Sequence, residues 1–241
     1  MKQLDRAWVE KSLSHLNAGE LEITGRLVDA SNATLFGLMH YEGSTLEVIY
    51  KPVAGERPLW DFPDGTLADR EFAAFLLSDH VGFDLVSPTV LREGPAGFGM
   101  VQRWIDVDES INLGTYFSQD IKELRHLALF DAVINNTDRK IGHLLPVQNG
   151  HLFACDHGVT FHTEDKLRTV LWQWAGDSLT DEEIEILEKT AIFLNENGSL
   201  LSAHLTEEEL QATKSRIANL HLGGVMPLPS EDWPAIPWPA Y

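Results

Sequence analysis

Alternation of apolar and polar positions predicts a strand-rich first part of the chain. Short runs of β-branched and aromatic residues are separated by Gly, Ser or Asn, which is typical of strands joined by tight turns. The strands are expected at residues 21–28, 34–41, 46–50, 89–92 and 99–104. Apolar residues with helical spacing predict two helices in the same part, over 4–16 and 67–78. The first three strands should form an antiparallel sheet.

From about residue 108 the pattern becomes mainly helical. Apolar positions recur at helical spacing over 120–134, and a strand, turn and strand are expected at 144–146 and 151–155. Two S/T-x-x-E capping boxes predict further helix starts, at Thr180 with Glu183 and at Thr206 with Glu209.

The last segment, residues 223–241, contains five Pro and two Trp and cannot form a regular helix. We expect Trp233 or Trp238 to dock it on the body and to regulate access to the site, although a flexible tail fits the same composition. The chain is therefore divided into residues 1–105, 106–222 and 223–241.

Composition narrows the classes of protein that the chain can represent. It has 241 residues, 44% of them hydrophobic, which is enough for a sizeable core and excludes wholesale disorder. Acidic residues outnumber basic ones by 37 to 18, and a net charge of −19 opposes binding to nucleic acid or stable association with anionic membrane. No apolar run reaches transmembrane length, there is no signal-peptide pattern, and the one cysteine excludes an internal disulfide. We therefore expect a cytoplasmic protein.

Polar side chains that could take part in catalysis are concentrated in two loops of the second part. In FDAVINNTDRKIGHLL, residues 130–145, they crowd nine positions after an apolar helix, and Asp156 follows an apolar strand eighteen residues after Asp138. Two carboxylates on such loops suit metal-assisted phosphoryl transfer, in which one orients the acceptor hydroxyl and the other holds Mg²⁺. Taken separately, each loop also fits an ordinary polar turn.

Taken together, the two loops resemble the phosphatidylinositol 3/4-kinase-like superfamily, with type II phosphatidylinositol 4-kinases and HipA toxin kinases as nearer forms. The resemblance rests on N-x-D-R at the end of a helix, a polar residue five positions after the Asp, and a D-x-G after a strand. The order of GRLVDASNATLFG, YKP, RPLWDFPDGTLADREFAAFLL and DHGVTFHTEDKLRTVLW is similar to an uncharacterised bacterial kinase-like family. It implies an α+β fold of two compact lobes, β-rich N-terminal and helical C-terminal, with ATP and Mg²⁺ or Mn²⁺ between them.

The resemblance assigns roles to particular residues. Lys51 would bind ATP phosphates and pair with Glu71, which lies on an otherwise apolar helix face and so independently needs a cationic partner. Asp138 would be the catalytic base and Asp156 the metal-binding carboxylate. Asp131 would be either catalytic or a brace for the catalytic loop.

Other assignments depend more on the resemblance alone. Ser31 and Asn32 match the phosphate-covering turn, and Gln102 lies where such kinases place the adenine-recognising hinge. His143 stands where the lipid kinases have the second metal ligand, Asn, and Lys140 stands where the superfamily often has His. If His143 binds the metal, the site should prefer Mn²⁺ more strongly over Mg²⁺, and activity should fall as the pH drops through about 6.5. Alternatively, His143 turns away and bonds a backbone carbonyl.

The preferred function is transfer of the ATP γ-phosphoryl group to a hydroxyl of a protein or small molecule. A nucleotide-binding pseudokinase with a regulatory role is the main alternative. A metallohydrolase built on His143, His157 and His162 is a third possibility. Lys166 and Arg168 would either meet a phosphate on the substrate or form a solvated pair.

Overall fold

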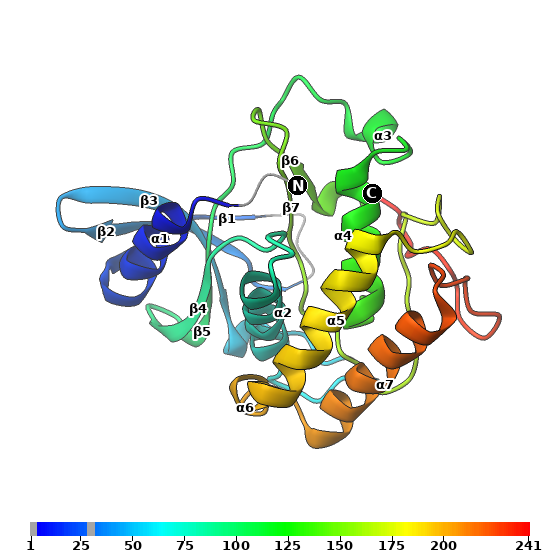
Figure 1. The fold of residues 1–241 in the computed structure, drawn as a ribbon. Helices are drawn as coiled ribbons and strands as arrows, with labels where there is room; N and C mark the ends of the chain where they lie inside the picture. The colour runs from blue at the N-terminus through cyan, green and yellow to red at the C-terminus, as the bar shows by residue number, and fades with distance from the viewer. Residues whose placement is uncertain (1–3, 28–31) are drawn as a thin grey trace.

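A five-stranded antiparallel sheet occupies the N-terminal part of the structure, and helices make up most of the rest (Figure 1). The computed structural model describes residues 4–27 and 32–241. The strands are β1 (Glu20–Arg26), β2 (Leu35–Tyr41), β3 (Ser44–Pro52), β4 (Thr89–Gly94) and β5 (Gly97–Arg103). Their order is β1-β2-β3-β5-β4, so β5 pairs with β3 on one side and with β4 on the other.

The other elements follow the predicted order. The helices before and between the strands are α1 (Arg6–Ala18), the 3-10 turn η1 (Val53–Gly55) and α2 (Leu67–Val81). Beyond the sheet lie α3 (Leu113–Tyr116), α4 (Lys122–Ile134), η2 (Ile141–His143), β6 (Leu144–Pro146), β7 (Leu152–Ala154), α5 (Asp181–Glu196), α6 (Gly198–Leu201) and α7 (Glu207–Gly223). The short strands β6 and β7 form a separate antiparallel pair.

Local chemistry explains where the predicted boundaries shift. Helix α1 begins two residues later than expected, because Asp5 is its N-cap and accepts a hydrogen bond from the Ala7 N–H. Strands β4 and β5 each extend into a hairpin turn at Pro95 and Ala96, where the surrounding glycines conceal the strand pattern. Both capping boxes are present: Thr180 and Glu183 start α5, and Thr206 and Glu209 start α7.

Buried apolar residues form two clusters. The smaller cluster packs α1 onto the sheet through residues such as Leu16, Met39 and Val101. The larger cluster joins α2 to α4, α5 and α7, with Leu77, Phe130 and Leu187 at its centre. Helix α2 also packs against β4 and β5, and in Figure 1 it lies between the sheet and the helices. The predicted α+β fold, β-rich at the N-terminal end and helical at the C-terminal end, is confirmed.

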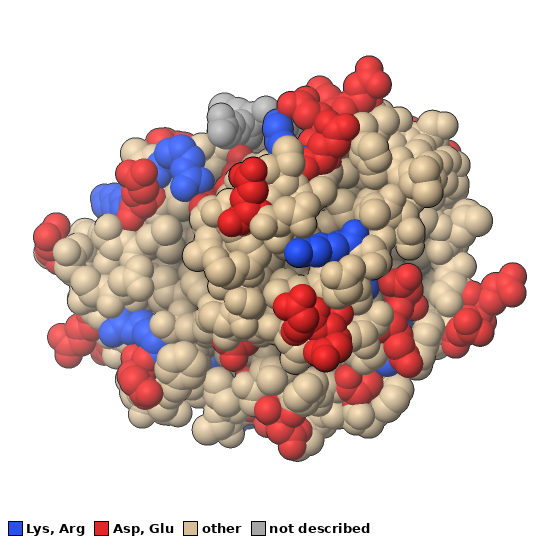
Figure 2. All heavy atoms as spheres, turned by 60° about the horizontal axis from the view of Figure 1, so that its bottom comes forward, with Lys and Arg blue, Asp and Glu red and all other residues tan. Residues whose placement is uncertain are grey.

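The excess of acid is distributed over the surface. Figure 2 shows acidic side chains scattered across one face, with far fewer basic ones between them. The acidic first turns of α5 and α7 contribute to this excess, and negative charge there is favourable because it meets the positive end of the helix dipole. The charge therefore also helps to start the helices.

Candidate functional site

A cavity of about 460 Å³ is lined by residues of the sheet, of α2, of the loops after α4 and β7, and of the C-terminal segment. Five residues singled out from the sequence lie on its wall: Asn32, Lys51, Glu71, Asp138 and Asp156. They are spread over more than 120 positions of the sequence. The fold thus brings the two carboxylate loops and the strand-terminal lysine to one place.

Lys51 lies between two carboxylates at the end of β3. Its Nζ is 2.6 Å from Glu71 Oε1 and 2.9 Å from Asp156 Oδ1. Burial disfavours a charged ammonium, but the two adjacent carboxylates outweigh it and raise the pKa of Lys51. The positive charge of Lys51 is the largest influence on Asp156 and holds the pKa of its carboxyl group well below its usual range. Both groups are therefore ionised at neutral pH.

The D-x-G turn is held against α2 by Glu71. The His157 N–H donates to Glu71 Oε2 at 2.9 Å, so one glutamate binds both Lys51 and the turn. Asp156 itself has φ of 62°, a left-handed conformation that is uncommon for a residue with a side chain. Strained backbone of this kind persists only where neighbouring contacts fix it, and here the contacts are those of Glu71 and Lys51.

The loop after α4 is fixed by its two asparagines. Asn135 caps the helix with φ of 52°, and its side chain binds the backbone of the segment at His162, Glu164 and Lys166. Asn136 accepts a hydrogen bond from the Asp138 N–H at 3.0 Å. The position of Asp138 is therefore set by backbone and amide contacts that do not involve its carboxylate.

The Asp138 carboxylate faces a mixed environment. Burial raises its pKa, and the charge of Lys140, whose Nζ lies 3.2 Å from Oδ2, opposes that rise. The side chain is 31% exposed, so a substrate can reach it. These properties suit a carboxylate that accepts a proton from a hydroxyl group.

Asp131 does not line the cavity, and its contacts favour the brace over the catalytic role of the two that the sequence left open. Asp131 and Arg139 both have 0% exposed side chains and are joined by paired contacts of 2.9 Å. Asn136 donates to the same carboxylate, and Arg139 also binds the Cys155 carbonyl and His157 Nε2. A fully buried Asp that is occupied in this way has no room for a substrate, and instead connects the two carboxylate loops.

Gln102 does not lie at the cavity either. It sits in β5 opposite Ile49 on one side and Thr89 on the other, and its side-chain amide donates to Thr89 Oγ1 at 2.8 Å. The strands β3 and β4 flank this residue, and recognition of adenine by its backbone stays a prediction. Ser31 lies outside the described residues, whereas Asn32 lines the cavity and accepts from the Arg57 N–H at 2.9 Å.

His143 lies beside Asp156. Its Nε2 is 3.4 Å from Asp156 Oδ2, and its Nδ1 accepts from the Lys140 N–H at 3.4 Å. Burial lowers the pKa of His143 to about 4, so the fall in activity expected near pH 6.5 moves to about pH 4. A role for His143 in metal binding stays a prediction.

The far wall of the cavity was largely missed by sequence reasoning. The indole rings of Trp60 and Trp233 stack with centroids 6.3 Å apart, and Lys166 Nζ lies 4.8 Å and 4.5 Å from them. Lys166 also pairs with Asp61 and Glu164. Cation–π contacts join positions that no sequence period relates, so the sequence indicated only that Lys166 could meet a ligand and that Trp233 or Trp238 could dock, not that they meet at Trp60.

The C-terminal segment docks on the body through Trp233 and not through Trp238, which is 90% exposed. Replacing Trp233 with Ala should lower the free energy of unfolding by about 2 kcal/mol, because stacking and cation–π contacts are lost. Trp238→Ala is the matched control and should change it by less than about 0.5 kcal/mol. Urea unfolding of the two variants measures both values, and equal effects would show that Trp233 does not anchor the segment.

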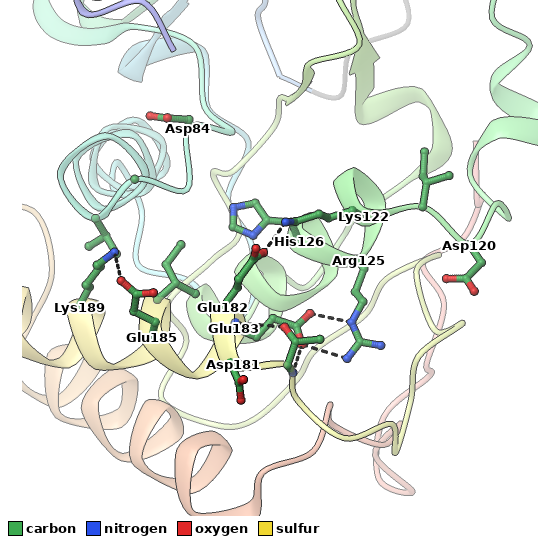
Figure 3. A pocket seen from close by; sticks show the side chains of 15 residues that line it. Asp84, Asp120, Lys122, Arg125, His126, Asp181, Glu182, Glu183, Glu185 and Lys189 are labelled. Carbon is green, nitrogen blue, oxygen red and sulfur yellow. Dashed lines mark hydrogen bonds and ion pairs between the residues drawn. The ribbon is translucent and has the colours of Figure 1, made fainter. Parts of the chain in front are cut away.

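A second, larger cavity lies away from these residues, between α2, α4 and α5 (Figure 3). It has a volume of about 980 Å³, but each of its lysines and its arginine is paired with a carboxylate. Arg125 binds Glu183 at 2.7 Å, Lys189 binds Glu185 at 2.7 Å, and Lys122 binds Glu182. This cavity therefore presents surface ion pairs rather than a set of converging free groups.

His126, on the wall of the second cavity, should make the stability of the protein depend on pH. Burial lowers its pKa to about 4, whereas the unfolded chain has an ordinary value near 6.5. Between these values the unfolded chain binds a proton that the folded protein does not, so stability falls as the pH drops through this window. The free energy of unfolding of the parent protein should fall between pH 7.5 and 5.0, and in His126→Gln this fall should be smaller by about 2 kcal/mol. If urea unfolding shows the same fall in the free energy of unfolding for the parent and for His126→Gln, the lowered pKa of His126 is wrong.

Comparisons place the chain in a family without supplying an activity. No family model matches the sequence. The chain is 39% identical over 262 residues to Protein Rv2133c of Mycobacterium tuberculosis, which covers 92% of this chain and 93% of that protein. It therefore belongs to the same family as Rv2133c. Among solved structures, a Helicobacter pylori proinflammatory kinase, CtkA, matches with a TM-score of 0.45 and 11% identity over 87% of this chain and 93% of that one.

The three histidines of the metallohydrolase alternative engage separate partners. His157 Nε2 accepts from Arg139, and His162 Nε2 lies 3.3 Å from Lys166 Nζ. Across residues 4–27 and 32–241, no three His, Cys, Asp or Glu side chains gather in a way that could hold a metal ion. In the same residues, none of the helices has the length and apolar character needed to cross a membrane.

Proposed function

We propose that the protein is an ATP-dependent phosphotransferase that moves the γ-phosphoryl group of ATP to a hydroxyl of a protein or small molecule. The observation that carries the proposal is the arrangement of Lys51, Glu71 and Asp156 on the same cavity as Asp138. Phosphoryl transfer needs few covalent contributions from the protein. It needs a cation for the phosphates, a carboxylate for the metal and a carboxylate for the acceptor, all held in place.

Lys51 supplies the cation for the phosphates. Its contact with Glu71 fixes the direction of a long side chain, and Glu71 is only 2% exposed and is itself held by the His157 N–H. The contact with Asp156 is the one that ATP phosphates would replace, because Asp156 is 44% exposed and lies on the open side of the pair. Lys51 thus has one fixed partner and one exchangeable partner.

The side chains present fit a divalent metal bound together with nucleotide. Asp156 is a hard oxygen donor kept ionised by Lys51, and His143 is its neutral neighbour. Mg²⁺ usually takes one or two carboxylates and completes its shell with phosphates and water, so a site with few protein ligands suits it. When bound, such a metal neutralises the charge that develops on the transferred phosphoryl group. Asp156, with or without His143, would hold it.

Asp138 is placed to act on the acceptor. Its carboxylate would accept the proton of the hydroxyl as the oxygen attacks the γ-phosphorus, while the bond from that phosphorus to the β-bridging oxygen breaks and ADP leaves. Lys140, 3.2 Å away, favours the ionised form of the base. The Asp131–Arg139 pair holds the loops of Asp138 and Asp156 next to each other, because Arg139 also binds the Cys155 carbonyl.

Transfer of radiolabel from γ-labelled ATP, together with nucleotide-induced thermal stabilisation, tests the proposal. Transfer to any acceptor in a panel of proteins and metabolites supports a phosphotransferase. Stabilisation by ATP and Mg²⁺ with no turnover over the whole panel would indicate a nucleotide-binding regulatory protein. Phosphate release from phosphorylated compounds in the absence of ATP would indicate a hydrolase and contradict the proposal.

A further inference from the structure

Arg168 is tied to the loop that carries Asp138. Its N–H donates to the Asn136 carbonyl at 2.9 Å, and its carbonyl accepts from the Arg139 N–H at 3.0 Å. These two bonds flank Asp138 on both sides. Arg168 lines the same cavity as Asp138, so its guanidinium and the acceptor-binding carboxylate belong to one region of the wall.

The guanidinium of Arg168 differs from the two lysines of the cavity, and from Arg57, which also lines the cavity but is exposed. Lys51 and Lys166 both lie within hydrogen-bonding distance of carboxylates. Arg168 makes no ion pair within residues 4–27 and 32–241, and its Nε is buried there without a hydrogen-bond partner. In a chain with 37 acidic residues, an unpaired arginine beside a reactive site is unexpected. A buried N–H without a partner is unfavourable, so this guanidinium is under-satisfied at the wall of the cavity.

The neighbouring wall is apolar and aromatic. Trp60, which is 82% exposed, stacks on Trp233, and both line the cavity together with Leu59. Asp61 lies at the same end, but its carboxylate is 3.3 Å from Lys166. A ligand in this cavity therefore has both the Arg168 cation and a flat apolar surface available, and the same cavity is lined by Asp138.

We propose that Arg168 binds an anionic group, a phosphate or a carboxylate, on the molecule that receives the phosphoryl group, while the Trp60–Trp233 wall contacts its carbon skeleton. The acceptor is then an anionic hydroxy compound or a side chain next to such a group. Arginine suits this role because its planar fork binds phosphate or carboxylate through two parallel hydrogen bonds. The description of the ligand as the acceptor rests on the proposed function, but the anion site does not.

The test is a calorimetric titration of inorganic phosphate into the full-length protein saturated with a non-hydrolysable ATP analogue and Mg²⁺. We expect phosphate to bind, and Arg168→Gln to weaken this binding at least about tenfold while leaving nucleotide affinity unchanged. Arg26→Gln is the matched control, because Arg26 is exposed on β1 away from the cavity. A parallel titration with acetate distinguishes the two sources: tighter phosphate binding indicates a phosphorylated acceptor, and tighter acetate binding a carboxylated one.

Three results would overturn the inference: absence of binding by both anions to the parent protein, equal anion affinity in Arg168→Gln, or loss of nucleotide affinity in that variant, which would assign Arg168 to ATP. If Arg168→Gln fails to fold, Arg168→Lys keeps the charge without the fork and should still weaken anion binding several-fold. If the parent protein binds no nucleotide, the proposed function fails, and the same titrations without nucleotide still test the anion site.

Discussion

Asp138→Asn is expected to reduce phosphoryl transfer by at least about 10²-fold while ATP and metal stay bound. The reason is that a positioned general base contributes about 10²- to 10⁴-fold, and an amide cannot accept the proton. The loop should survive the change, because the contact from Asn136 reaches the Asp138 backbone N–H and not its carboxylate. Single-turnover transfer from γ-labelled ATP measures the rate, and equilibrium titration measures nucleotide affinity.

Asp156→Asn should behave differently in the same two measurements. This carboxylate lies against Lys51 and is the proposed metal ligand, so its loss should weaken the metal-dependent part of nucleotide binding as well as transfer. Glu164→Gln, an exposed carboxylate that pairs with Lys166 outside the proposed chemistry, is the control and should change neither value greatly. If both Asp variants lose nucleotide binding to the same extent, the division of roles between Asp138 and Asp156 is wrong.

The sequence predicted the elements well where a local pattern decides them. Both capping boxes, the β6–β7 pair and the helix that carries Glu71 form at or near the expected residues, because their signals lie within one or two turns of chain. The same holds for the pairing of Glu71 with Lys51, since a carboxylate on an apolar helix face needs a cation.

Contacts between distant segments were not predictable in the same way. The sequence left Asp131 either catalytic or a brace, because nothing in the local pattern shows that Arg139 turns back to pack against it; this contact favours the brace. The neighbours of Gln102 predicted a strand, which forms as β5, whereas its role at a hinge came from the resemblance alone and has no local signal. The lowered pKa of His143 likewise depends on burial by tertiary structure.

The capping glutamates show how local and distant roles combine. Glu209 starts α7 and also binds Arg70 of α2, and Glu183 starts α5 and also binds Arg125 of α4. Each glutamate therefore fixes a helix end against another helix. Because α2 carries both Arg70 and Glu71, the contact with Glu209 helps to set the position of the residue that holds Lys51. The cavity is thus supported by the packing of α7, although no residue of α7 lines it.

The second large effect is expected at the pair formed by Lys51 and Glu71. Lys51→Met should leave Glu71, which is 2% exposed, without its cation, and the loss of one partner from a buried pair costs on the order of 3 kcal/mol of stability. Nucleotide affinity should fall at least tenfold, because the phosphates lose the ammonium that lies nearest to the metal carboxylate. Glu71→Gln should have a smaller effect on affinity, since Lys51 remains charged beside Asp156.

A double-mutant cycle separates the pair from its surroundings. The combined variant, Lys51→Met with Glu71→Gln, should be less destabilised than the sum of the single variants, with a coupling of about 1–3 kcal/mol, because neither partner is left charged and alone. The exposed pair of Lys122 and Glu182 is the matched control and should show a coupling below about 1 kcal/mol. Urea unfolding and nucleotide titration of the seven proteins, which share one parent, give both sets of values. Additive effects at Lys51 and Glu71, with nucleotide affinity unchanged in Lys51→Met, would mean that this lysine does not bind ATP.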